Sequence, residues 1–186
     1  PHGLDTTTKN YTTTYDMALL MSYAMKNETF KTITSTKDYH PTIISGKKMY
    51  YHNKHRLIQS NEKVTGGKTG YTKNAKRTLV TSFKQEDFEI VVVTFNCSDD
   101  WNVHEGLANY CFDKYKQKRI LSKFDVLFYA SFDQSYLIEN EKLLVPIRES
   151  ETINYKIYED DEGIRIVYFI NKEEVGDVIF RSIKDE

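Results

Sequence analysis

The stretch that decides the fold of this 186-residue chain is Gly66-Gly-Lys-Thr-Gly-Tyr-Thr-Lys-Asn-Ala-Lys-Arg-Thr-Leu-Val-Thr-Ser-Phe83. A Gly66-Gly67 turn precedes Lys68-Thr-Gly-Tyr-Thr72, and a strand-like alternation follows over Thr78–Phe83. A Lys-Thr-Gly on an exposed strand edge suits the binding of a substrate that carries a carboxylate. Lys68 would supply a positive potential, and the Thr69 hydroxyl would donate a hydrogen bond to a carboxylate oxygen.

The next two residues add backbone chemistry to this motif. Gly70 removes a side chain, so that a peptide can lie against the strand. The backbone N–H of the residue after it, Tyr71, could then face a developing oxyanion. A short motif of common residues recurs by chance, so its meaning depends on the segments around it.

Two further segments agree in type and order with a known family. Pro1-His-Gly-Leu-Asp5 is followed by the helical pattern of Thr12–Leu20, and Asn53–Ile58 carries an Asn-x-x-x-Leu ahead of the Lys-Thr-Gly strand. Together with Gly66–Phe83, these segments resemble the low-molecular-weight penicillin-binding proteins, which are serine-type D-alanyl-D-alanine carboxypeptidases. The resemblance covers the whole chain and is strongest over residues 1–118.

This resemblance implies an α+β fold in two parts. Residues 1–118 would form the carboxyl-terminal part of a β-lactamase/transpeptidase-like catalytic domain, with helices packed on an antiparallel sheet. Residues 119–186 would form a small all-β domain. The charge changes at the same place, since residues 1–118 carry 17 Lys+Arg against 12 Asp+Glu, and residues 119–186 carry 9 against 15.

The residue patterns predict the elements of the first part. Thr13-Thr-Tyr-Asp16 resembles a capping box and starts a helix that runs to about Lys26. A short helix or turn over Glu28–Ser35 and a hairpin between Tyr39–Ile44 and Lys48–Tyr51 follow. Three strands are then predicted, at Val64–Tyr71, Arg77–Phe83 and Phe88–Phe95. The last element is a helix that Asn102–Glu105 can cap and that ends in Lys116–Arg119, with Val103, Leu107, Tyr110 and Cys111 on its apolar face.

Short β-type runs separated by polar turns predict the second part. These runs are Val126–Tyr129, Leu143–Ile147, Ile153–Tyr158, Ile164–Ile170 and Val175–Phe180. They hold no cluster of His, Cys and carboxylates with the spacing of metal ligands, and no candidate nucleophile.

The Ser-x-x-Lys motif that carries the family's nucleophile is not found at the expected position in this chain. In these enzymes a Ser-x-x-Lys helix and a Ser-x-Asn loop precede the Pro-His-Gly-Leu element, with which this chain begins. The strings Ser45-Gly-Lys-Lys48 and Ser60-Asn-Glu-Lys63 do occur, but Ser45 lies in the predicted hairpin turn and Ser60 in a polar loop. We therefore expect the nucleophile to lie upstream of Pro1 and this chain alone to be inactive.

The roles of individual residues follow from the resemblance. The intact protein would be a hydrolase that trims the terminal D-alanine through an acyl-enzyme, with no metal or organic cofactor. Lys68 would be catalytic, and Thr69, Gly70 and Tyr71 would bind substrate. His104 lies near the position where some relatives carry an arginine that holds the substrate carboxylate, although a plain helix-surface histidine is the alternative.

The same resemblance implies partners and a location. The substrate would be a peptidoglycan stem peptide ending in D-Ala-D-Ala, β-lactams would inhibit, and the missing amino-terminal half or a second copy would complete the domain. The protein would lie outside the cytoplasm at a bacterial cell wall or membrane. A non-catalytic peptidoglycan-binding or interaction module derived from that family is the alternative function.

Net charge and cysteine content bear on two further classes, the nucleic-acid-binding proteins and the disulfide-stabilised proteins. The net charge of −1 gives no electrostatic argument for nucleic-acid binding. Cys97 and Cys111 are too few for a disulfide framework and are predicted to be buried free thiols, with a pairing between them left open.

Overall fold

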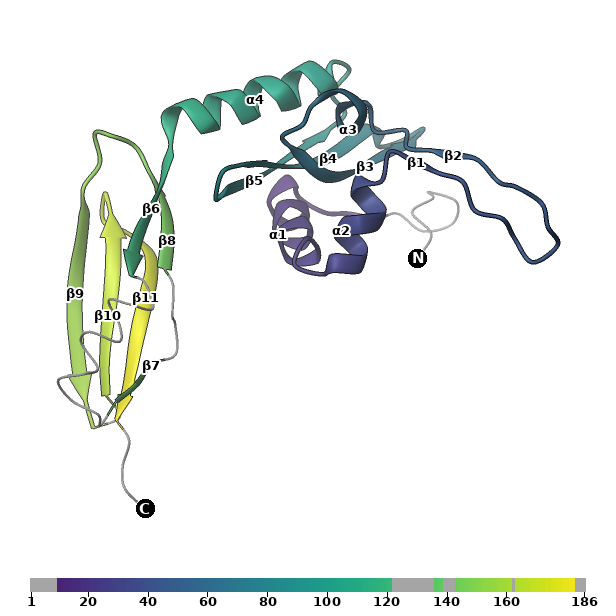
Figure 1. The fold of residues 1–186 in the computed structure, drawn as a ribbon. Coiled ribbons are helices and arrows are strands. Elements are labelled where there is room, and N and C mark those ends of the chain that lie inside the picture. Colours follow the sequence, from purple (N-terminus) through teal and green to yellow (C-terminus); the bar gives the residue numbers. More distant parts are fainter. Residues whose placement is uncertain (1–9, 122–135, 139–142, 162, 183–186) are drawn as a thin grey trace. The chain divides into compact units, whose positions relative to one another are not determined.

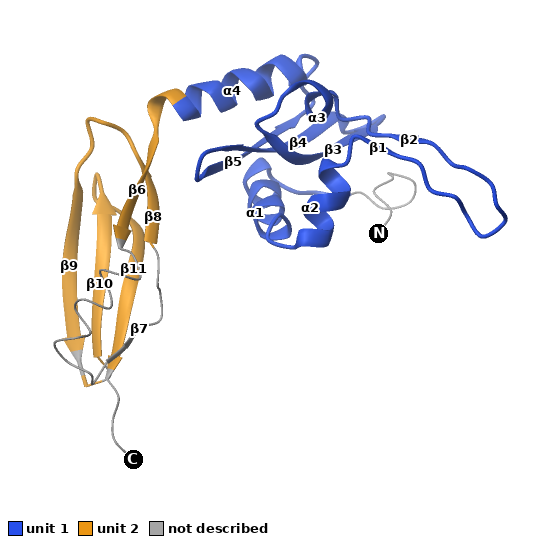
Figure 2. Cartoon of the chain, in the orientation of Figure 1, with its two compact units in different colours: residues 1–112 blue, residues 113–186 orange. Residues whose placement is uncertain are grey.

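The chain forms two compact units in the computed structural model, which describes residues 10–121, 136–138, 143–161 and 163–182. The units comprise residues 1–112 and 113–186 (Figure 2). The sequence placed the domain boundary after residue 118, where the charge changes, whereas the division by packing follows the last buried residue of a helix, Phe112. Each unit is described by itself.

An antiparallel sheet of three strands in chain order forms the centre of the first unit. Its strands are β3 (Val64–Thr72), β4 (Lys76–Gln85) and β5 (Phe88–Phe95), which match the predicted ones to within two residues. The central strand, β4, is buried without interruption from Leu79 to Phe83. Because both faces of β4 are covered, the sheet is the middle layer of this unit.

Helices cover the two faces of this sheet (Figure 1). Helices α1 (Thr14–Ala24) and α2 (Glu28–Ser35) lie on one face, and α3 (Arg56–Ser60) and α4 (Asp100–Lys114) lie on the other. The predicted start of α1 is confirmed, because the Thr13 side chain accepts a hydrogen bond from the Asp16 N–H at 3.0 Å.

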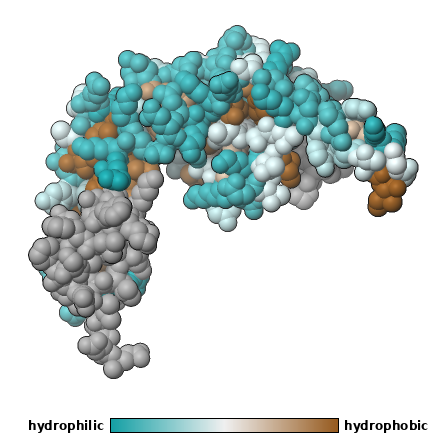
Figure 3. All heavy atoms as spheres, viewed as in Figure 1, coloured by the Kyte–Doolittle hydropathy of each residue, from teal (hydrophilic) through white to brown (hydrophobic). Residues whose placement is uncertain are grey.

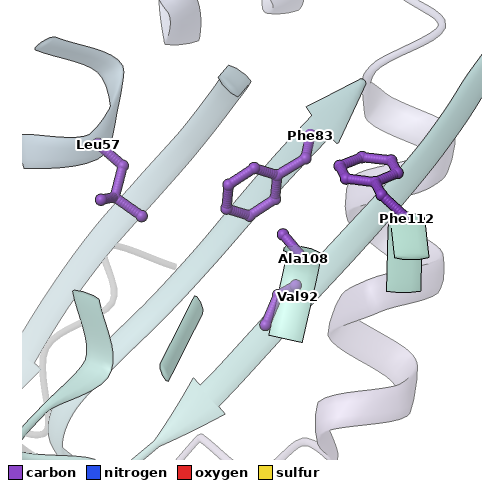
Figure 4. Close-up of a cluster of buried hydrophobic side chains, with 5 residues drawn as sticks. All are labelled: Leu57, Phe83, Val92, Ala108 and Phe112. Carbon is purple, nitrogen blue, oxygen red and sulfur yellow. The ribbon is translucent and has the colours of Figure 1, made fainter. Parts of the chain in front are cut away.

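The larger hydrophobic cluster of this unit lies between the sheet and the helices α3 and α4. It joins side chains from α3, β4, β5 and α4, namely Leu57, Phe83, Val92, Ala108 and Phe112 (Figure 4). A second cluster on the opposite face joins Met21 and Met25 to Val80 of β4.

The predicted face of α4 is wrong. The sequence placed Val103, Leu107, Tyr110 and Cys111 toward the sheet, but Leu107 and Tyr110 are exposed. The buried side chains are instead the i, i+4 row of Asp100, His104, Ala108 and Phe112. Polar side chains of the sheet bind the first two residues of this row, since Arg77 pairs with Asp100 and the hydroxyls of Thr81 and Thr94 lie within hydrogen-bond distance of His104. These contacts favour the orientation of α4 in which this row faces the sheet. The two cysteines are half-buried free thiols, so the pairing that was left open is not formed.

A β-hairpin projects from the first unit between α2 and α3. Strands β1 (Asp38–Tyr39) and β2 (Tyr51–His52) pair at its base, and Thr42 bridges to Lys48 nearer the tip. The predicted hairpin is thereby confirmed, and Ser45 lies in its turn.

The second unit is built from strands in the part of it that the structure describes. One sheet has the order β7-β11-β10-β9, and a two-stranded sheet pairs β6 with β8. Their bounds are β6 Lys116–Leu121, β7 Tyr136–Ile138, β8 Leu143–Ile147, β9 Ile153–Asp160, β10 Gly163–Ile170 and β11 Glu173–Ser182. The four predicted runs from Leu143 onward are therefore confirmed as strands.

Two predicted segments, Pro1–Leu4 and the strand Val126–Tyr129, lie outside the described residues. Within the described residues, no helix has both the length and the apolar character needed to cross a membrane.

Candidate functional site

Lys68-Thr69-Gly70-Tyr71 lies on β3, at the edge of the three-stranded sheet. Strand β3 pairs with β4 on one side and has no strand partner on its other side among the described residues. Lys68 is exposed and its Nζ donates to the Thr69 carbonyl at 2.7 Å, while the Tyr71 side chain is 66% exposed. The motif thus combines an accessible cation with an unpaired strand edge.

Adjacent residues of this motif point to opposite faces of the sheet. Lys68 pairs with Val80 and Gly70 with Thr78, so both share the face covered by α1. Thr69 pairs with Leu79 on the other face. A Cβ on Gly70 would lie 2.4 Å from the Thr78 Oγ1, so a side chain at this position would require the Thr78 hydroxyl to move.

A cavity of about 1040 Å³ opens along this strand edge. All four motif residues line it, and four cationic side chains contribute to its wall against one carboxylate. The cations are Lys54, Arg56, Lys68 and Arg77, and the carboxylate is Asp100. The excess of positive charge favours an anionic ligand.

The carboxylate of Asp100 is already neutralised by Arg77. The two side chains form a bidentate pair, with Nη2–Oδ1 at 2.6 Å and Nε–Oδ2 at 3.0 Å, and Asp100 is buried. This hydrogen-bonded pair raises the pKa of Arg77. The pair ties the start of α4 to β4. Because the charges of Arg77 and Asp100 cancel, Lys54, Arg56 and Lys68 give the cavity its positive charge.

Trp101 lies close to two of the cavity's guanidinium groups. The guanidinium carbons of Arg56 and Arg77 lie 5.9 and 5.7 Å from the centre of the indole ring, which is within the range of cation–π attraction. The buried indole Nε1 has no hydrogen-bond partner in the part of the chain that the structure describes. The indole therefore contacts both arginines where they line the cavity.

Sequence reasoning missed Lys54, Arg56, Arg77 and Trp101. A signal was available for Arg77, which is opposite Tyr71 in the β3–β4 hairpin. Pairing the residues on the two sides of the β3–β4 turn, one by one from Thr72 and Lys76, places Arg77 opposite Tyr71 and therefore beside the motif. Trp101 and Arg56 come from two helices, and no local pattern links them.

The substrate-binding role predicted for His104 needs correction. His104 is 0% exposed and lies beneath the sheet, so it is neither a helix-surface histidine nor a group that can touch a ligand in the cavity. Its Nδ1 lies 2.8 Å from the Thr81 Oγ1 and its Nε2 lies 3.0 Å from the Thr94 Oγ1. The buried polar network on β4 and β5 is therefore what holds His104.

A second buried histidine completes this network. His55, at the start of α3, places its Nε2 2.9 Å from the same Thr81 hydroxyl. Thr81 thus connects two histidines, and its single hydrogen can be donated to only one of them. Burial lowers the pKa of both His55 and His104 to about 4.

The two buried histidines predict a fold that weakens in mild acid. Both are neutral in the folded state and have ordinary pKa values near 6.5 when unfolded, so stability is complete above pH 6.5 and falls as the pH drops toward 4. Between pH 7.5 and 5 the loss is about 2 kcal/mol per histidine. Urea unfolding of the chain at both pH values measures it, and a free energy of unfolding that does not fall contradicts the prediction.

A sequence profile of the D-alanyl-D-alanine carboxypeptidase family matches residues 1–99, just over half of the chain. The chain belongs to this family. The D-alanyl-D-alanine carboxypeptidase DacF of Bacillus subtilis is 35% identical over 98 residues, which make up 53% of this chain and 25% of DacF.

Solved structures of a penicillin-binding protein and of a D-alanyl-D-alanine carboxypeptidase share the fold. Penicillin-binding protein 5 from Haemophilus influenzae superposes with a TM-score of 0.62 at 16% identity, covering 91% of this chain and 55% of that one. The D-alanyl-D-alanine carboxypeptidase DacD from Francisella tularensis gives a TM-score of 0.62 at 14% identity, covering 96% and 61%. These likenesses confirm the predicted α+β fold class. The chain spans a quarter to about three-fifths of the length of these relatives.

Proposed function

We propose that this chain forms the carboxylate-binding wall of a serine-type D-Ala-D-Ala carboxypeptidase. The observation that carries the proposal is the position of Lys68-Thr69-Gly70 on an edge strand that lines a cavity rich in cationic side chains. The substrate would be a peptidoglycan stem peptide that ends in D-Ala-D-Ala. Such a peptide offers both a carboxylate for the cations and an extended backbone for the strand edge.

Each motif residue has a distinct task in this proposal. The ammonium group of Lys68 supplies a positive potential, and the Thr69 hydroxyl donates to the terminal carboxylate. Such charge-assisted hydrogen bonds are roughly twice as strong as neutral ones. Gly70 allows the close approach of the peptide, and the Tyr71 N–H donates to the oxyanion that develops on the scissile carbonyl.

The chemical step is acyl transfer. A serine from another segment of the protein attacks the carbonyl between the two D-alanines, D-alanine leaves, and water hydrolyses the acyl-enzyme. The chain's own residues bind the substrate and stabilise charge in this reaction. A β-lactam also carries a carboxylate near its reactive carbonyl. It would therefore bind at the same surface, at Lys68 and Thr69, and inhibit hydrolysis of the peptide. Cell-wall peptidoglycan as the substrate places the proposed reaction outside the cytoplasm.

Helix α1 supports the proposal that more protein covers the first unit. Its side chains Tyr15, Leu19 and Tyr23 recur at i, i+4 spacing and are exposed, with Leu20 exposed beside them. An apolar helix row of this kind is typical of a protein–protein contact. We assign it to the nucleophile-bearing segment of the same protein or to a second copy.

A peptide titration tests the proposal on the chain itself. Diacetyl-Lys-D-Ala-D-Ala added to ¹⁵N-labelled chain is expected to shift the amide signals of Thr69–Tyr71. The same peptide with a carboxyl-terminal amide should bind roughly tenfold more weakly, since a hydrogen bond to a charged group is lost. Lys68→Gln should weaken binding similarly, whereas Lys73→Gln, in the turn after β3, should not.

The outcomes separate the proposal from its alternatives. Equal binding of acid and amide peptides, or shifts that avoid β3, would contradict a carboxylate site at Lys68 and Thr69. Binding of this kind without any hydrolysis by the full-length protein would favour the non-catalytic peptidoglycan-binding module.

A further inference from the structure

The β1–β2 hairpin of the first unit carries an apolar tip that the proposed carboxypeptidase site does not use. Its two sides are held together by the Met49 N–H donating to the Pro41 carbonyl at 2.9 Å. At the turn, the Ile43 N–H donates to the Lys47 carbonyl at 3.0 Å, and the Gly46 N–H donates to the Ile43 carbonyl at 2.8 Å. The tip is therefore an ordered turn with a fixed set of outward-facing side chains.

Two isoleucines occupy this turn. Ile44 is 110% exposed, which is as much as in an isolated extended peptide, and Ile43 is exposed beside it. Figure 3 shows the resulting hydrophobic patch at the end of the hairpin, separate from the polar surface around it. Solvating two adjacent aliphatic side chains is costly, so their placement at the far end of a projecting element favours a use in binding.

The residues behind the tip are cationic and aromatic. Lys47 and Lys48 follow the isoleucines after Ser45 and Gly46, and residues 39–51 contain no Asp or Glu. The one acidic residue of the hairpin strands, Asp38, lies at the base, 2.7 Å from the His52 Nδ1. Three exposed tyrosines lie farther from the tip than the lysines: Tyr50, and the pair of Tyr39 with Tyr51 at the base.

We propose that this hairpin tip inserts into the surface of an anionic phospholipid bilayer. Ile43 and Ile44 would enter the boundary between headgroups and acyl chains, at a depth of about 5–10 Å. Lys47 and Lys48 would lie at the level of the phosphates. With a rise of about 3.3 Å per residue, Tyr50 would lie roughly 7 Å behind the Thr42–Lys48 bridge, at the outer edge of the headgroup layer.

The order of side chains favours lipid over other partners. An apolar end, then cations, then an aromatic belt follows the change in polarity from acyl chain to phosphate to water. A sugar polymer is bound by the flat faces of aromatic rings and would give Ile44 no partner. A protein groove could accept the isoleucines but would not by itself require two adjacent lysines and an absence of acids.

Vesicle sedimentation of the full 186-residue chain tests this proposal. Binding is expected to vesicles of equal parts phosphatidylglycerol and phosphatidylcholine, and to be at least tenfold weaker to phosphatidylcholine alone. Ile44→Ser should weaken binding to the anionic vesicles by roughly tenfold, since most of one aliphatic side chain's transfer is lost. Lys47→Gln and Lys48→Gln should each weaken it by about fivefold.

The matched control is Ile33→Ser, which removes an isoleucine of 67% exposure from α2 of the same unit. This variant should bind as the unaltered chain does. A second readout is Ile44→Trp, whose added fluorescence should shift to shorter wavelength on the anionic vesicles and be quenched by brominated acyl chains.

Several results would overturn the proposal. Failure of the chain to sediment with anionic vesicles, or equal loss in the Ile33 and Ile44 variants, would do so. Equal binding to neutral vesicles would remove the role of the lysines. Retention on purified peptidoglycan that depends on Ile44 while vesicles do not bind would assign the tip to the polymer instead.

Discussion

Replacing Lys68 with Ala, in a full-length protein that joins this chain to a serine nucleophile, is expected to lower kcat/KM for a D-Ala-D-Ala peptide by at least about 100-fold. Lys68 is the exposed cation of the motif, and its Nζ already contacts the Thr69 carbonyl at 2.7 Å. The change would remove the positive potential at the point where negative charge gathers in the transition state. Steady-state hydrolysis of diacetyl-Lys-D-Ala-D-Ala measures the effect.

The controls for this prediction use the same strand and its turn. Thr69→Val should also lose about 100-fold, whereas Thr69→Ser keeps the hydroxyl and should retain most of the activity. Lys73→Ala removes an exposed lysine outside the cavity wall and should leave turnover unchanged. Turnover near the unaltered level in both Lys68→Ala and Thr69→Val would refute the roles assigned to them.

Gly67→Ala is expected to destabilise the first unit by about 3 kcal/mol, which is the upper range for overpacking a filled core. A Cβ at this position would lie 2.4 Å from the His55 Nε2 and 2.7 Å from the Val80 carbonyl oxygen. The carbonyl belongs to the central strand and cannot move aside, and the histidine is held by Thr81. The free energy of unfolding in urea measures the loss.

Gly106→Ala is the matched control. It makes the same chemical change within α4, where no atom lies within 4 Å of the added Cβ. Because alanine favours the helix over glycine, this variant should gain up to about 1 kcal/mol. Equal stability of the two variants would show that His55 and the Val80 carbonyl do not fill the space beside Gly67.

Local pattern was sufficient for most elements of this fold. The strands β3, β4 and β5 and the helices α1 and α2 lie where alternation and capping predicted them, because each signal comes from residues near one another in the chain. The same holds for the Lys68-Thr69-Gly70 motif and for the hairpin turn at Ser45. The family likewise followed from the sequence, since its motifs are short and contiguous.

Only the tertiary structure decided how these elements meet. The face of α4 was predicted from hydrophobicity alone and was wrong, because β4 and β5 present Thr81, Thr94 and Arg77, which bind His104 and Asp100 more favourably than they would an apolar row. The positive charge of the cavity has the same origin, since Arg56 comes from α3 and Lys68 from β3. The sequence by itself determined the elements, the motif and the family, whereas partners distant in the chain decided the burial of His104 and the charge of the site.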